Sequence, residues 1–281
     1  MFIAIDIGKT NTRVASSKDM KTVLKVERFP TNPSIMEQKR LLKEFSDKLA
    51  EGESIKAAVI GVPGIIDKVN GSFYKINTYP ELNGLPFIVL TDETIKCQEI
   101  YVQNDALLAG LGEAARGSGK EFDIVSYLTL STGVGGARIV FKEIDPTYYF
   151  MEPGHQIIVH DGKVDPFCGQ KGCLQAYLSG PAFEETYKVK PEDCADEAIW
   201  AEYSKYLASV VINIISMWSP EVIVIGGGVS QKFDFFYPGL IENLGKQNFF
   251  PIPEIRKAAF GDDSGIHGGF AYLSKVTEKG L

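Results

Sequence analysis

The fold class follows from one segment near the start of the sequence: Phe2-Ile-Ala-Ile-Asp-Ile7, then Gly8-Lys-Thr-Asn11, then Thr12-Arg-Val-Ala15. An apolar run, a short turn of small and polar residues and a second run are typical of a β-hairpin. The apolar run has the length of a strand, not of a helix. We therefore expect an antiparallel pair of strands here, with a polar turn exposed between them.

The second half of the sequence repeats this plan. The run Ile124–Leu130 is followed by Ser131-Thr-Gly-Val-Gly-Gly136 and then by Ala137–Phe141. An internal repeat of one supersecondary unit indicates two similar domains. We expect the two domains to share a hinge, because no low-complexity linker divides the chain.

Other segments complete an α/β pattern. Helical spacing or length predicts helices at Met36–Ala50, Asp105–Glu113 and Glu197–Trp218. Apolar runs predict strands at Ala57–Val62, Ile100–Val102 and Val222–Ile225. Alternation of strands and helices is typical of α/β domains.

Composition and charge narrow the function classes. The 281 residues are 44% hydrophobic and 23% charged, as in an ordinary globular protein. The formal net charge of −7 lacks the basic footprint of a nucleic-acid binder. Four cysteines are too few for a disulfide scaffold at this length. With no signal peptide and no membrane-length apolar run in the sequence, we expect a cytoplasmic protein with a small-molecule partner, and neither a nucleic-acid nor a membrane partner.

The first turn carries residues suited to phosphate. Backbone N–H groups of a tight turn cradle phosphate oxygens, and hydroxyl groups add donors. A strand-end carboxylate, here Asp6, can hold Mg²⁺ directly or through water. The alternative is an ordinary hairpin turn. The candidate ATP-binding residues of this segment are Asp6, Gly8, Lys9, Thr10 and Asn11.

Two further glycine-rich turns point to the same ligand. Three glycines within Gly133–Gly136 cost more backbone entropy than a structural turn needs. Gly226, Gly227 and Gly228 follow a parallel-type strand and would let a base and a ribose lie against the backbone. For this last segment the alternative is a helix-entry turn.

A carboxylate stands at another strand end, in Gln103-Asn104-Asp105. Capping the helix that follows is the commoner use of such an aspartate. Phosphoryl transfer, however, requires positioning, charge neutralisation and one group that accepts the hydroxyl proton. We therefore consider Asp105 as a general base.

Taken together, these segments resemble the ROK family of sugar kinases, within the actin-like ATPase fold, which is ribonuclease H-like. The resemblance covers nearly the whole chain. It implies two α/β domains with an interdomain cleft. We expect the smaller at residues 1–108, joined by a C-terminal helix at 266–279, and the larger at residues 109–265. It also implies an ATP-dependent hexose kinase, glucokinase-like, that uses Mg²⁺ and forms a homodimer.

The resemblance also assigns roles to residues. Asp105 is the implied general base, and Asp6 is implied to lie near Mg²⁺. Thr10, Thr132 and Gly133 are implied phosphate contacts, and Gly226–Gly228 match the adenosine motif. Glu152-Pro-Gly-His155 matches a sugar-binding element. The implied sugar-binding residues are Gly64, Asn104, Glu152, His155 and Gln175.

Three positions depart from the family pattern. Lys9 stands where the first phosphate motif usually has a second glycine. A lysine would be strained there if the position needs a positive φ; if it does not, its ammonium group could reach a phosphate.

The second departure concerns zinc. The family signature Cys-x-Cys-Gly-x-x-Gly-Cys binds zinc together with the Gly-His histidine, but here Pro166 takes the first cysteine's place. His155, Cys168 and Cys173 remain, whereas a closed zinc site wants four ligands. Asp165 and His160 are substitutes that do not stand at the expected position. The site either retains zinc or has become a pair of small buried cysteines.

The third departure is Gln175, where sugar-specific members commonly have a glutamate. An amide can accept one hydrogen bond and adds donors, but it lacks the charge. Mannose, fructose, allose and N-acetylhexosamines therefore stand beside glucose as substrates. Polyphosphate is an alternative donor.

A non-catalytic sugar-sensing regulator is the rival function. ROK repressors carry an N-terminal helix-turn-helix domain, whereas this sequence starts at the first phosphate motif. Retention of Asp105 and of both phosphate loops favours the kinase.

Overall fold

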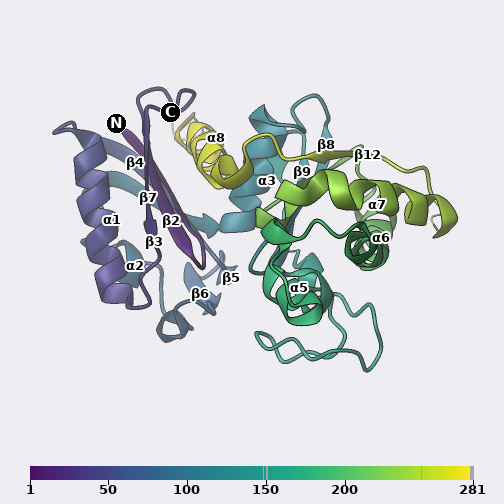
Figure 1. The fold of residues 1–281 in the computed structure, drawn as a ribbon. Coiled ribbons are helices and arrows are strands. Elements are labelled where there is room, and N and C mark those ends of the chain that lie inside the picture. Colours follow the sequence, from purple (N-terminus) through teal and green to yellow (C-terminus); the bar gives the residue numbers. More distant parts are fainter. Residues whose placement is uncertain (148, 150, 248, 279–281) are drawn as a thin grey trace. The chain divides into compact units, whose positions relative to one another are not determined.

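A computed structural model describes residues 1–147, 149, 151–247 and 249–278, which form two compact units (Figure 1). The first unit contains the described residues of Met1–Arg116, Pro146–Phe150 and Asp263–Leu281. The second contains those of Gly117–Asp145 and Met151–Asp262. Residue 279 of the predicted C-terminal helix lies outside the described residues.

The first unit is built on a five-stranded sheet of order β3-β2-β1-β4-β7. Its strands are β1 (Phe2–Ile7), β2 (Asn11–Ser17), β3 (Lys25–Pro30), β4 (Ile55–Val62) and β7 (Cys97–Asn104). The predicted hairpin is confirmed, because β1 pairs with β2 in antiparallel register. Strands β1, β4 and β7 run parallel, so their carboxyl ends lie at one edge of the sheet.

Alternation along β1 distributes its side chains to two cores. Ile3 and Ile5 pack toward α1 (Ile35–Ala50), and Ala4 packs against α8 (Ser264–Glu278). In Figure 1, α8 lies beside α3 (Asp105–Arg116). Side chains that alternate with a period of two thus reach opposite faces of the sheet, with Ala4 under α8 and with Ile3 and Ile5 under α1. The remaining elements of this unit are β5 (Ile65–Asp67), β6 (Ser72–Lys75), η1 (Pro80–Leu82) and α2 (Ile88–Thr91).

The second unit repeats the plan, with a sheet of order β10-β9-β8-β11-β12. Its strands are β8 (Ile124–Leu130), β9 (Val134–Val140), β10 (Glu143–Ile144), β11 (Val222–Gly226) and β12 (Glu254–Lys257). Strands β8 and β9 form the second predicted hairpin, which is confirmed. Strands β8, β11 and β12 run parallel, so this sheet also gathers carboxyl ends at one edge.

The core of the second unit is mainly aliphatic, with aromatic side chains such as Trp200 and Phe236 within it, and it is covered by two long helices, α6 (Glu197–Trp218) and α7 (Phe233–Gln247). Helix α6 begins where the Asp196 carboxylate accepts from the Ala198 N–H, and it ends at Ser219 in a left-handed conformation. Trp200 on α6 is fully buried. The shorter helices are η2 (Pro153–His155), α4 (Gln175–Leu178), α5 (Gly180–Tyr187), η3 (Pro191–Asp193), η4 (Gly228–Lys232) and η5 (Gly261–Asp263), whose last residue belongs to the first unit.

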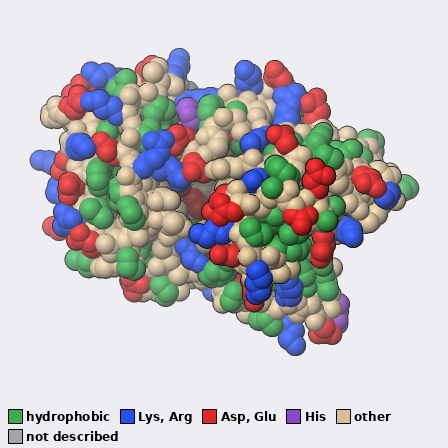
Figure 2. All heavy atoms as spheres, in the orientation of Figure 1, with side chains coloured by type: hydrophobic (Ala, Val, Ile, Leu, Met, Phe, Trp, Pro, Cys, Tyr) green, Lys and Arg blue, Asp and Glu red, His purple; other side chains and the backbone are tan. Residues whose placement is uncertain are grey.

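Charge is distributed evenly over the visible surface. Figure 2 shows Lys and Arg side chains interspersed with Asp and Glu on the face that it draws. In the part of the chain that the structure describes, no helix combines the length and the apolar character that crossing a lipid bilayer would need.

Candidate active site

The first predicted phosphate loop is an exposed turn whose backbone is hydrogen-bonded to Thr31. The Gly8 N–H donates to the Asn11 carbonyl at 3.0 Å, which closes the turn between β1 and β2. Thr31, just beyond β3, fixes it twice: its hydroxyl donates to the Gly8 carbonyl at 2.8 Å, and its N–H to the Thr10 carbonyl at 2.9 Å. Lys9, Thr10 and Asn11 are exposed on the other side. Hydrogen bonds to Thr31 therefore hold the backbone of the loop, and its polar side chains face outward.

The backbone at Lys9 decides between the two readings of that position. Lys9 is not among the residues with positive φ. The alternative of a strained lysine is therefore wrong, because strain is expected only in the left-handed region. Contact between the Lys9 ammonium group and a phosphate stays a prediction.

Asp6, the predicted magnesium residue, lies at the end of β1 and beneath the start of α8. An added Cβ on Gly265 would lie 2.9 Å from its carboxyl carbon. Arg13 Nη1 is 3.5 Å from Asp6 Oδ2, and Arg13 Nε is 3.9 Å from Asp263 Oδ1. The carboxylate is thus held at the sheet edge in a mixed-charge group, and its role toward Mg²⁺ stays a prediction.

Asn104 and Asp105 stand where β7 ends and α3 begins. The Asn104 Oδ1 accepts from the Leu107 N–H at 2.9 Å, so Asn104 supplies the helix cap. The Asp105 carboxylate accepts from the Ala106 N–H at 2.8 Å and is half-buried. The side chain that caps α3 toward Leu107 is therefore that of Asn104, and the role of Asp105 as a general base stays a prediction.

Gly64 is joined to Asn104. The Asn104 Nδ2 donates to the Gly64 carbonyl at 3.0 Å, which ties the exit of β4 to the end of β7. Gly64 has a φ of +97°, and an added Cβ would lie 2.4 Å from the Lys75 carbonyl oxygen, so glycine is required. One N–H and one lone pair of the Asn104 amide remain for a ligand.

These groups share one edge of the first sheet. Gly61 on β4 pairs with Asp6 of β1 on one side and with Gln103 of β7 on the other. Two strand spacings of roughly 5 Å therefore separate the end of β1 from the Asn104–Asp105 pair. The carboxyl ends of parallel strands are the usual ligand edge of an α/β sheet.

The second sheet has an equivalent edge. The end of β8 leads into Thr132 and Gly133, and the neighbouring β11 leads into Gly226–Gly228, with Gly226 in register with Thr129. Gly227 has a φ of +84°, and an added Cβ would lie 2.4 Å from the Leu130 carbonyl oxygen. The glycine therefore lets the two loops approach, which places the predicted phosphate and adenosine segments side by side.

The predicted sugar-binding segment Glu152–His155 packs on the same unit's β9. An added Cβ on Gly154 would lie 2.0 Å from the Val134 carbonyl oxygen, so backbone meets backbone there. Burial raises the pKa of Glu152 to about 7. A carboxyl group that titrates near neutrality is common in functional sites.

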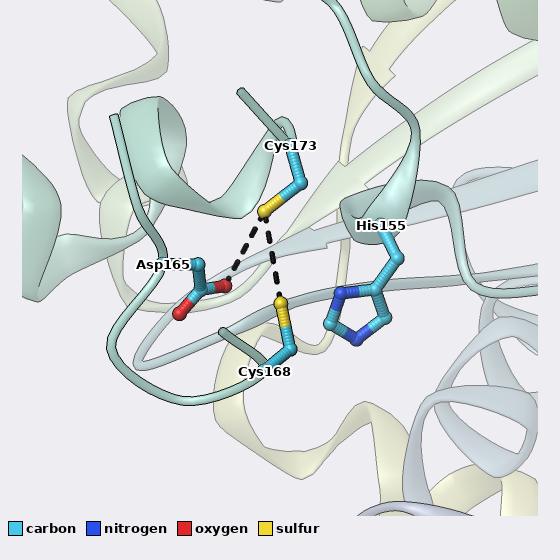
Figure 3. Close-up of side chains that lie close together, drawn as sticks. All are labelled: His155, Asp165, Cys168 and Cys173. Atoms are coloured by element: carbon cyan, nitrogen blue, oxygen red, sulfur yellow. Dashed lines mark hydrogen bonds between the residues drawn. The ribbon is translucent and has the colours of Figure 1, made fainter. Parts of the chain in front are cut away.

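The last residue of this segment, His155, lies close to three other side chains, those of Asp165, Cys168 and Cys173 (Figure 3). One ligand atom from each lies within 4.8 Å of the others. His160, the other substitute considered from the sequence, is outside this group; its side chain is 94% exposed and contacts Asp161. The structure therefore assembles the three predicted metal residues and adds Asp165.

The spacing of the two sulfurs fits the zinc that the resemblance implies. Two sulfurs bound tetrahedrally at 2.3 Å from Zn²⁺ would be about 3.8 Å apart. Cys168 Sγ and Cys173 Sγ are 3.9 Å apart. Burial raises the pKa of the Cys173 thiol to about 12, so a cation would be needed to keep it as a thiolate. His155, Cys168 and Cys173 would hold the ion, whose contribution would be structural.

The side-chain amide of Gln175 is buried and hydrogen-bonded within the protein. It is 8% exposed, its Oε1 accepts from the Val134 N–H at 3.0 Å, and its Nε2 donates to Asp165 Oδ2 at 2.6 Å. Burial alone would raise the pKa of Asp165, but hydrogen bonds from the Phe167 N–H, Gln175 and the two thiols hold it below its usual value. A direct contact of Gln175 with sugar stays a prediction.

Comparison with known proteins identifies the relatives of this arrangement. A model of the ROK family matches residues 2–276. An N-acetyl-D-glucosamine kinase from Histophilus somni is 29% identical over 307 residues, covering 98% of this chain and 100% of that protein. A glucokinase from Thermotoga maritima is 27% identical over 311 residues, covering 97% of both chains.

The fold is similarly matched. A crystal structure of a ROK family glucokinase from Streptomyces griseus, in complex with glucose and AMPPNP, superposes with a TM-score of 0.82. The match covers 97% of this chain and 98% of that chain at 21% sequence identity. The predicted α/β fold of the actin-like ATPase type is confirmed.

Proposed function

The chain belongs to the ROK family, and we propose that it is a sugar kinase that transfers the terminal phosphoryl group of Mg-ATP to a hexose hydroxyl. The observation that carries the proposal is the edge of the first sheet, where the half-buried Asp105 carboxylate shares the carboxyl ends of parallel strands with the Gly8–Asn11 loop. Phosphoryl transfer requires a positioned phosphate group and a group that accepts the hydroxyl proton, and this edge of the sheet carries a candidate for each.

In this proposal Asp105 accepts the proton of the attacking hydroxyl group, and Asn104 and Gly64 position the sugar. General bases of this kind contribute roughly 10²–10⁴-fold to rate. The Asn104 amide fixes the start of α3 and the exit of β4 together, so a sugar bound there would meet a preorganised base. Asp6 would hold Mg²⁺ at the end of β1, with Lys9, Thr10 and Asn11 toward the phosphates.

The nucleotide would bind along the edge of the second sheet. Thr132 and Gly133 would contact phosphate groups, and Gly226–Gly228 would accommodate the adenosine. The close approach of Gly227 to Leu130 supports this assignment, because it sets both segments next to each other within one unit.

Glucose and N-acetylglucosamine are the first two substrates to test, because relatives over nearly the full length carry those names. Glu152 and His155 would bind sugar hydroxyls, as the family motif implies. A ring has two nitrogens, so His155 could bind a metal through one and a hydroxyl through the other. Mannose and fructose complete the panel.

The test is an ADP-release assay with Mg-ATP across that panel, with Asp105→Ala as the matched variant. Sugar-dependent ADP release that the variant loses supports the kinase. If a sugar raises the melting temperature but no hexose causes release of ADP from ATP, the sugar-sensor function is favoured. Sugar phosphorylation with polyphosphate but not with ATP would show that polyphosphate is the phosphoryl donor. The homodimer and the cytoplasmic location stay predictions, and light scattering of the purified protein tests the first.

A further inference from the structure

The loop that carries the two clustered cysteines folds back on itself. Val164 pairs with Lys171 in an isolated bridge, the Asp165 N–H donates to the Gln170 carbonyl at 2.9 Å, and the Gly169 N–H donates to the Asp165 carbonyl at 2.8 Å. This fold brings a residue three positions before Cys168 onto the far cysteine, Cys173. Asp165 is 1% exposed, and a buried carboxylate needs partners or a cation.

We propose that Asp165 is the fourth ligand of a tetrahedral zinc site completed by His155, Cys168 and Cys173, and that Gln175 connects this site to the Ser131–Val134 loop. Asp165 thereby takes the chemical place that Pro166 cannot fill. Zinc accepts sulfur, imidazole and carboxylate ligands in closed four-coordinate sites.

The distances within the cluster agree with this assignment. A sulfur at 2.3 Å and an oxygen at 2.0 Å from tetrahedral Zn²⁺ would be about 3.5 Å apart. Cys173 Sγ and Asp165 Oδ2 are 3.5 Å apart. Figure 3 shows the four side chains pointing toward one another, with Asp165 and Cys168 on one loop and His155 on a different segment.

Hydrogen bonds around the ligands hold them in place. The Phe167 N–H donates to Asp165 Oδ1 at 2.7 Å, which leaves Oδ2 facing Cys173. The Gln170 N–H lies 3.5 Å from Cys168 Sγ. Such outer partners orient metal ligands and tune their affinity. The arrangement is therefore built as a site and is not a chance grouping.

Gln175 extends the site to the phosphate loop. Its amide bridges Asp165 Oδ2 and the Val134 N–H, with separations of 2.6 Å and 3.0 Å. An added Cβ on Gly133 would lie 2.9 Å from Gln175 Oε1, so the amide lies directly against that loop. A glutamate at this position would set two carboxylates against each other, whereas the glutamine donates to Asp165. Gln175 is a positioning residue in this proposal.

The experiment measures metal on the full chain. Purified protein is stripped with a chelator, reloaded with Zn²⁺ or Co²⁺, and compared with Asp165→Asn, Asp165→Cys and the control Asp161→Asn, which changes a neighbouring acid that is 77% exposed. We expect one Zn²⁺ per chain and tetrahedral cobalt bands for the unchanged protein and the control. Asp165→Asn should weaken zinc affinity at least about 100-fold, because losing even an outer partner costs 10–100-fold.

Asp165→Cys keeps the proposal falsifiable if the asparagine variant fails to fold. It should retain one Zn²⁺ and increase the sulfur-to-cobalt charge-transfer absorbance from that of two thiolates to that of three. An unchanged cobalt spectrum in this variant would remove Asp165 from the ligand set. Absence of stoichiometric metal in the unchanged protein, or equal zinc affinity in folded Asp165→Asn, would overturn the proposal.

The connection through Gln175 is tested by hydrogen exchange over residues 131–136. Zinc removal should speed exchange of the Val134 amide in the unchanged protein. In Gln175→Ala the same amide should exchange fast with or without zinc. If the exchange rate of the Val134 amide changes neither on zinc removal nor in Gln175→Ala, the connection is contradicted. None of these measurements requires turnover, so their failure leaves the kinase proposal intact.

Discussion

Helix α8 approaches α3 so closely that one added methyl group should destabilise the first unit. An ideal Cβ on Gly268 would lie 1.6 Å from the Leu108 carbonyl oxygen and 2.9 Å from the Gly112 N atom. Both neighbours are backbone atoms, so no side-chain rotation relieves the overlap. To restore an ordinary contact of about 3.5 Å, the helices would have to separate by roughly 2 Å.

The expected cost of Gly268→Ala follows from these distances. Overpacking that forces side-chain and backbone shifts typically costs about 1–3 kcal/mol, and occasionally more. Alanine recovers at most about 1 kcal/mol of helix propensity. We expect the free energy of unfolding to fall by at least about 2 kcal/mol. Gly245→Ala on α7 is the matched control, because its added Cβ meets nothing within 4 Å; it should raise stability by about 0.5–1 kcal/mol.

Urea denaturation followed by far-ultraviolet circular dichroism measures both variants, and hydrogen exchange assigns the loss to α3 and α8. A lower midpoint for Gly268→Ala with faster exchange in those two helices is the expected result. A loss below about 0.5 kcal/mol, the scale of a surface substitution, would refute the close helix contact.

Three further predictions concern the site. Asp105→Ala should lower kcat by about 10²–10⁴-fold while sugar affinity by calorimetry stays measurable, and turnover within threefold of the unchanged protein would contradict its role. Burial raises the pKa of Glu152 to about 7, so its carboxylate forms as pH rises through 7; KM for the sugar should fall between pH 6 and 8 and should stay flat in Glu152→Gln. Gly227 has a φ of +84°, and an added Cβ would lie 2.4 Å from a carbonyl oxygen, so Gly227→Ala should raise KM for ATP and lower the free energy of unfolding by about 1–3 kcal/mol. The control is Gly228→Ala, whose added Cβ meets nothing within 4 Å. It should raise KM for ATP less and leave stability nearly unchanged.

The hairpins and the repeat could be predicted from sequence because their signals are local. Apolar runs and glycine turns lie within a few residues of each other, and a continuous apolar run such as Phe2–Ile5 predicts a strand whose Ile3, Ala4 and Ile5 are buried, as observed. The same holds for α6, whose predicted bounds Glu197–Trp218 match the structure, since length, apolar content and the following Ser219-Pro220 all agree.

The contacts that complete the site could not be predicted in the same way. Asp165 reaches Cys173 only because the loop between them folds back through backbone hydrogen bonds that carry no sequence motif. Gln175 accepts a hydrogen bond from Val134, 41 residues away in the sequence, and no local pattern of residues predicts such a distant contact. Asn104, and not Asp105, caps α3, because either residue type can cap and geometry alone decides.

The central claim is that Asp105 accepts a hexose proton as the phosphoryl group leaves ATP. Phosphorus NMR of one reaction mixture tests it most directly, with Mg-ATP, the hexose that gives the fastest ADP release, and either the unchanged protein or Asp105→Ala. We predict that ADP and a sugar phosphate appear together with the unchanged protein and that neither accumulates with the variant over the same time. ADP that appears without a sugar phosphate, or a sugar phosphate formed equally fast by Asp105→Ala, would contradict the account.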